Sequence, residues 1–76
     1  MTVPKNIPLK DFRKFLEHFG CKIIRTKGGH EVWSKPGLLR PVILQSHITP
    51  VPLHIIKSNL RTLGLTIDDL IDFLKK

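Results

Sequence analysis

The pattern of apolar and polar positions predicts a helix at the beginning of the chain. Between about Pro8 and Phe19, apolar side chains recur every three or four residues, which places them on one side of a helix. They are Leu9, Phe12, Phe15, Leu16 and Phe19, while Lys10, Asp11, Arg13, Lys14, Glu17 and His18 fall on the other, solvated side. Proline suits the first turn of a helix and glycine the position after its end, so Pro8 and Gly20 mark the two limits.

Three short segments then have the composition of β-strands: 21–27, 30–34 and 40–45. Gly28-Gly29 predicts a two-residue hairpin turn between the first two strands, and Lys35-Pro36-Gly37 predicts a second turn. Two hairpins in a row predict a three-stranded antiparallel sheet.

The alternation of side chains along a strand predicts which residues share a face of this sheet. In the first strand, Cys21, Ile23 and Arg25 would lie on one face, and Lys22, Ile24 and Thr26 on the other. In the second strand, Val32 and Trp33 point to opposite faces. We expect Trp33 to lie in the core; the alternative is an exposed ring that stacks on a base.

Two more helices are predicted after a proline-containing loop, 46–52. The first runs from Pro52 or Leu53 to Leu63 and ends at Gly64. Its buried residues are Ile55, Ile56, Leu60 and Leu63. Thr66, with Asp69 three residues later, is a good N-cap for the last helix, and Lys75-Lys76 suit its C-terminal end. Its inward-facing residues are predicted to be Ile67, Leu70, Ile71 and Leu74.

The order of elements is therefore α-β-β-β-α with an additional short C-terminal helix, an α+β protein with helices packed on one face of the sheet. With 76 residues and 41% hydrophobic content, we expect a single domain spanning 1–76. A lone cysteine, Cys21, excludes an intrachain disulfide and fits a reducing compartment. The chain has no apolar run of membrane-spanning length and no signal-peptide pattern, so we expect a cytoplasmic protein without a membrane partner.

Charge narrows the choice of partner. Thirteen Lys and Arg residues against six Asp and Glu give a net charge of +7. Residues 1–40 hold nine of these basic residues and three of the acidic ones, a net +6. The positive electrostatic field of such a chain attracts polyanions, of which nucleic acid is the usual one. The alternative is a surface that is charged for solubility.

The first candidate for catalysis is His30, which follows the glycine turn directly. Histidine can give or take a proton near neutral pH. RNA carries its own nucleophile, the 2′-hydroxyl, beside each phosphate, so one histidine can act as general base or general acid in its cleavage without a metal. The alternative is a strand histidine with its ring on the solvated face of the sheet.

Candidate phosphate-binding groups surround this histidine in sequence: Lys22, Arg25, Lys27, Gly28, Gly29 and Lys35. The two glycines are first of all a hairpin turn, but turn N–H groups can also bind an anion. His47 could approach a bound phosphate. No metal ligation is predicted, because neither His47 nor His54 has a partner at metal-ligand spacing. We expect Cys21 to be a small buried residue rather than a nucleophile.

Several motifs together resemble HicA-type toxins, the mRNA interferases of bacterial type II toxin–antitoxin systems. They are the stretch Phe15 to Trp33, the segment Val42-Ile43-Leu44 and the helix end Asn59-Leu60-Arg61-Thr62-Leu63-Gly64. The resemblance covers about residues 9–64, and Lys27-Gly28-Gly29-His30 is its most specific part.

The resemblance implies a fold like that of the double-stranded-RNA-binding domain (dsRBD-like). It also implies that His30 is catalytic, that mRNA is the substrate, that a HicB-type antitoxin is the partner, and that no cofactor is needed. Two positions depart from the family pattern: Gly29 stands where serine is usual, and Glu31 where many members carry a second histidine. The helix 66–76 extends beyond the pattern and is expected to pack on the core or contact the antitoxin.

The residues leave two other functions open. One is a non-catalytic double-stranded-RNA-binding module, which would bind RNA in a salt-dependent way and leave it intact. The other is a protein-interaction domain that uses the apolar terminal helix.

Overall fold

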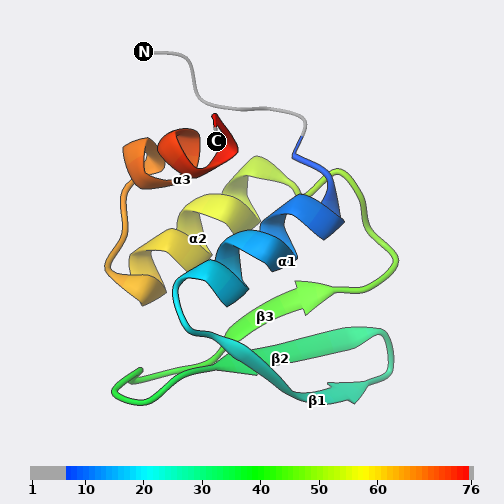
Figure 1. Cartoon of the computed structure of the whole chain (residues 1–76). Coiled ribbons are helices and arrows are strands. Elements are labelled where there is room, and N and C mark those ends of the chain that lie inside the picture. The colour runs from blue at the N-terminus through cyan, green and yellow to red at the C-terminus, as the bar shows by residue number, and fades with distance from the viewer. Residues whose placement is uncertain (1–6, 76) are drawn as a thin grey trace.

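A three-stranded antiparallel sheet with order β1-β2-β3 forms one side of the molecule, and helices cover one of its faces (Figure 1). This computed structural model describes residues 7–75. The elements in that range are α1 (Leu9–His18), β1 (Lys22–Lys27), β2 (His30–Ser34), β3 (Val42–Gln45), α2 (Leu53–Leu63) and α3 (Ile67–Leu74). The predicted α+β class and element order are confirmed. Each helix in this range is too short to traverse a lipid bilayer.

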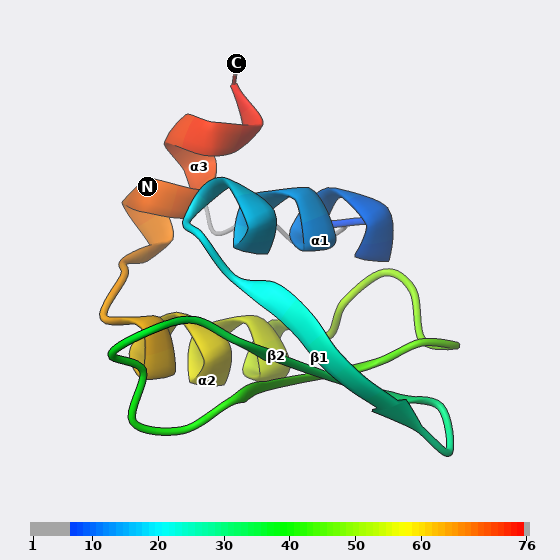
Figure 2. The same ribbon diagram turned by 60° about the horizontal axis from the view of Figure 1, so that its bottom comes forward.

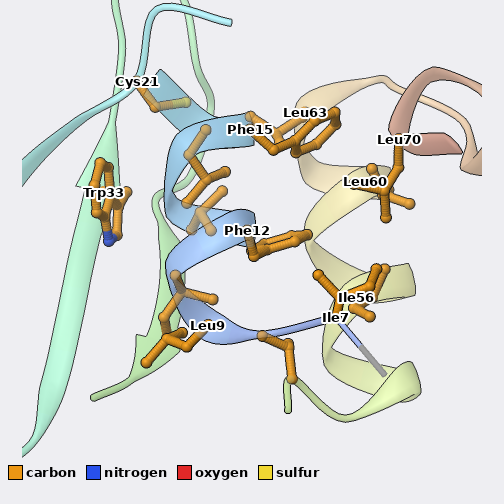
Figure 3. Packing of buried hydrophobic residues seen from close by; sticks show 14 residues of the cluster. Ile7, Leu9, Phe12, Phe15, Cys21, Trp33, Ile56, Leu60, Leu63 and Leu70 are labelled. Atoms are coloured by element: carbon orange, nitrogen blue, oxygen red, sulfur yellow. The ribbon is translucent and has the colours of Figure 1, made fainter. Parts of the chain in front are cut away.

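Helix α1 lies at the centre of the core, with the sheet on one side and α3 on another, while α2 packs beside α1 and against β3. Phe12 and Phe15 are fully buried and point from α1 toward α2 (Figure 3). Trp33 of β2 lies on the sheet side of α1 and is 4% exposed, so its predicted place in the core is confirmed. Helix α3 lies on the side of α1 and α2 that faces away from the sheet (Figures 1 and 2).

The helix ends follow the predicted capping residues, with small shifts in the bounds. Pro8 and Phe19 are cap residues of α1 rather than helical ones. Gly64 ends α2 in the left-handed conformation, with φ 72°. Thr66 and Asp69 form a reciprocal capping box at the start of α3. Strand β3 begins two residues later than predicted, because Pro41 has no N–H to donate to the sheet.

A β-bulge in β1 makes one predicted face assignment wrong. Ile23 pairs with Trp33, but Arg25 pairs with the next residue of β2, Val32, so Ile24 is an extra residue. Ile23 and Arg25 therefore face opposite sides of the sheet, as do Lys22 and Thr26. The bulge turns Arg25 to the face away from the helices.

The inward face of α3 also differs from the prediction, most clearly at Leu74. Leu70 is fully buried as expected, but Leu74 is 36% exposed. Phe73 takes the inner position instead, with its ring centroid 5.5 Å from that of Phe15. Residues three apart share a helix side, so Leu70 and Phe73 form the contact stripe. Lys76, one of the predicted C-terminal cations, lies outside the described residues.

Candidate functional site

A tight turn joins β1 to β2 and places His30 at the first position of β2. Gly28 and Gly29 have φ values of 57° and 82°, as a two-residue hairpin turn of type I′ requires. Lys27 and His30 pair on either side of this turn. The hairpin predicted from the two glycines is confirmed.

The register of the sheet brings three of the predicted site residues onto one face. Lys27, His30 and Gln45 are directly opposite one another on β1, β2 and β3. Opposed residues have their side chains on the same face, with Cα atoms roughly 5 Å apart. Arg25 lies in the next row, beside Val32 and Ile43, on the same face. This face is the one away from the helices, and His30, Lys27 and Arg25 are all exposed on it.

Lys22 and Lys35 lie at the other end of the sheet. Lys22 pairs with Ser34, the last residue of β2, about 13 Å along the strand from His30. Lys35 follows Ser34, and its Nζ donates a hydrogen bond to the carbonyl oxygen of Phe19 at 3.3 Å, at the C-terminal end of α1. The structure therefore does not bring these two lysines to the glycine turn.

A buried carboxylate beside His30 escaped the sequence reasoning. Glu31 is 4% exposed and faces the helices. Its carboxylate accepts hydrogen bonds from Nε and Nη2 of Arg13, from Nε1 of Trp33 at 3.1 Å and from Oγ of Ser46 at 2.8 Å. Arg13 lies outside the apolar stripe of α1, as predicted, and its partly exposed guanidinium pairs with Glu31. The sequence held one signal for the burial of Glu31: side chains alternate between the two faces along β2, which puts Glu31 on the same face as Trp33.

The contacts of Glu31 determine the protonation state of its carboxyl group. The hydrogen bonds from Arg13 are the main reason that the pKa of Glu31 is lowered, and those from Ser46 and Trp33 act in the same direction. Burial raises the pKa of Glu31 but is outweighed. Glu31 is therefore ionised at neutral pH. It ties α1, β2 and the loop after β3 together directly behind His30.

The loop after β3 is attached to the glycine turn. The N–H of Ser46 donates a hydrogen bond to the carbonyl oxygen of Gly29 at 2.7 Å. The ring of His47 lies against Gly29 so closely that a Cβ atom added there would be 3.1 Å from His47 Nδ1. The loop and the turn lie at the same end of the molecule (Figure 1). His47 thus lies beside the turn that carries His30, although it is far from it in sequence.

Alanine substitutions at the two glycines should separate backbone strain from the contact with His47. Gly28→Ala and Gly29→Ala each place a Cβ on a residue with positive φ, which should lower the free energy of unfolding by about 1–2 kcal/mol. Only Gly29→Ala adds an atom against His47, because nothing lies within 4 Å of the Cβ built at Gly28. Urea unfolding should show similar losses, while imidazole NMR signals of His47 should shift in Gly29→Ala alone. Equal shifts in both variants would contradict the contact.

Cys21 has the environment of a core residue. It is 2% exposed, as predicted for a small buried side chain. Burial raises the pKa of its thiol, which disfavours the reactive thiolate. Among residues 7–75, no three His, Cys, Asp or Glu side chains are grouped as ligands of a metal ion.

The fold and the turn are those of a small α+β protein with a histidine at the tip of a β-hairpin, on a basic sheet face. A protein-family model described as HicA toxin of bacterial toxin-antitoxin matches residues 9–65, well over half of the chain. The chain therefore belongs to the HicA toxin family, and the resemblance seen in its motifs is confirmed. No match was found among curated proteins or among solved structures.

Proposed function

We propose that this toxin is a ribonuclease that cleaves mRNA and that His30 transfers a proton in the reaction. The observation that supports this most is the exposed face on which Lys27, His30 and Arg25 lie together, beside the glycine turn. A histidine surrounded by cations in this way can meet a phosphodiester. Membership of a toxin family generally formed by ribonucleases points to RNA as the polyanion.

The reaction needs two proton transfers at one phosphate. A general base takes the proton of the 2′-hydroxyl, and the 2′-oxygen attacks the phosphorus. The bond from phosphorus to the 5′-oxygen breaks, and a general acid protonates the leaving oxygen. The products are a 2′,3′-cyclic phosphate and a 5′-hydroxyl. His30 serves in one of these two transfers, and Lys27, Arg25 and the N–H groups of Gly28 and Gly29 stabilise the negative charge on the pentavalent phosphorus. Lys22 and Lys35 lie at the far end of the sheet, where they would contact phosphates further along the bound RNA.

The partner proposed for the toxin is a HicB-type antitoxin that covers this face. The face carries cations, so an antitoxin segment with acidic side chains would pair with Lys27 and Arg25 and exclude RNA from His30. A neighbouring reading frame that encodes an acidic protein would support this assignment.

The activity is tested by incubating single-stranded RNA with the purified toxin in the presence of a chelator. We expect fragments that end in a 2′,3′-cyclic phosphate, identified by mass spectrometry, and the same rate with or without the chelator. RNA that is bound but stays intact would instead identify a non-catalytic RNA-binding module. RNA that is neither bound nor cleaved at low salt would leave the protein-interaction domain as the explanation.

A further inference from the structure

A pocket of about 320 Å³ opens beside His30 and is not used by the chemistry proposed above. His30, Gln45 and His54 are polar residues in its lining, and Ile43, Ile48 and Ile55 contribute apolar surface. The pocket is therefore largely apolar with a few hydrogen-bonding groups, the composition of a small-ligand site.

The walls of the pocket are held in place by contacts on two sides. Gln45 is directly opposite His30, and Ile43 lies one row further on the same sheet face. Helix α2 brings His54 and Ile55, and it is fixed to the outer edge of β3 by Asn59, whose Nδ2 donates to the carbonyl oxygen of Ile43 at 3.3 Å. The loop that carries Ile48 is attached to α1, because Oγ1 of Thr49 accepts from the N–H of Leu9 at 3.1 Å. The pocket is preformed.

We propose that this pocket binds one unpaired base of the RNA, that of a nucleotide next to the cleaved phosphodiester; the inference rests on the proposed ribonuclease function. A base has apolar faces and a hydrogen-bonding edge, which match the isoleucines and the polar side chains respectively. The Gln45 amide offers both a donor and an acceptor, and the His54 imidazole can offer either. These two residues select the base.

Two cations near the pocket favour an occupant that carries a phosphate, as a nucleotide does. Lys27 and Arg25 share the sheet face of His30, so a phosphate held there places the base of the same nucleotide within reach of the pocket. A base in a duplex is stacked and its pairing edge is occupied, so it cannot enter. The inferred substrate is therefore single-stranded RNA or a loop, despite the dsRBD-like fold.

Filling the pocket tests the inference by catalysis. Ile43 is 40% exposed, so Ile43→Trp should fold normally while closing the pocket. We expect kcat/KM on single-stranded RNA to fall about tenfold or more. Leu39→Trp is the matched control, a similar enlargement at an exposed residue outside the pocket, and should cleave as the wild type does. In Gln45→Ala, the base preference at one position beside the cut, mapped on a randomised RNA, should change.

Binding is tested with 2′-O-methyl tetranucleotides, which cannot be cleaved because the 2′-oxygen is blocked. Methyl NMR signals of Ile43, Ile48 and Ile55 should shift saturably, those of Ile23 should not, and the same strand in a duplex should have no effect. A wild-type toxin that does not cleave RNA but shows these shifts would refute the ribonuclease function and retain the base pocket.

Other results would overturn the proposed base pocket without affecting the proposed ribonuclease function. The inference fails if the wild type cleaves RNA while Ile43→Trp keeps its rate, Gln45→Ala keeps its base preference and the methyl signals stay still. It also fails if Ile43→Trp abolishes binding of the co-expressed antitoxin but leaves RNA cleavage intact, because the pocket would then belong to a protein interface.

Discussion

Replacing His30 with alanine is expected to lower the rate of RNA cleavage about 10²- to 10⁴-fold, the range that a positioned general acid or base contributes. The fold should survive, because His30 is exposed at the beginning of β2 and contributes nothing to the core cluster. Cleavage of a fluorescent single-stranded RNA measures the effect in vitro. Expression of the variant should also no longer arrest growth.

His18→Ala is the matched control for this variant. His18 is also an exposed histidine, but it is the last residue of α1 and its ring packs on Phe19 and on Phe73 of α3. We expect the His18→Ala variant to cleave RNA at the wild-type rate and to be slightly less stable than the wild type. If folded His30→Ala retained wild-type cleavage, the assignment of His30 as the proton-transfer residue would be wrong, even with RNA cleavage by the wild type established.

Much of the fold could be predicted because its signals are local. The helical spacing of Leu9, Phe12 and Phe15 defines α1, and the glycines of the first turn require positive φ at their own positions. What could not be predicted depends on contacts across the fold. The bulge at Ile24 has no local signature, and it decides whether Arg25 faces the helices or the face with His30.

The candidate site was predicted only where sequence neighbours remain neighbours in space. Lys27 and His30 meet because two residues of turn separate them. Lys35, only five positions after His30, lies at the far end of β2 because a strand extends about 3.3 Å per residue. Gln45 and His54 reach the same end of the molecule through the sheet register and the start of α2, which a single sequence does not reveal. His47, predicted as a group that could approach a phosphate, lies against Gly29 of the turn.

The pairing of Glu31 with Arg13 was missed for the same reason, and it carries the largest expected effect on stability. Glu31→Ala should lower the free energy of unfolding by about 2–4 kcal/mol, because the buried indole N–H of Trp33 loses its acceptor and the partly exposed guanidinium of Arg13 loses its partner. A domain of this size has roughly 4–11 kcal/mol in all. Urea unfolding at pH 7 measures the change. Glu31→Gln keeps one acceptor oxygen and should cost about 1–3 kcal/mol.

Acid should remove the contribution of this carboxylate in the wild type. The pKa of Glu31 in the folded protein lies below the ordinary value of a glutamate, about 4.3, so its charge contributes fully to stability above about pH 5. As the pH falls below about 5, the unfolded chain takes up a proton at Glu31 first, and stability begins to fall. The contribution is fully lost once the pH has also fallen through the lower pKa of Glu31 in the folded protein. Glu31→Gln should therefore show a flatter dependence of unfolding free energy on pH in this range. Glu17→Gln, at an exposed position of α1, should keep the wild-type slope. An equally steep loss in Glu31→Gln would mean that other carboxylates cause the acid sensitivity.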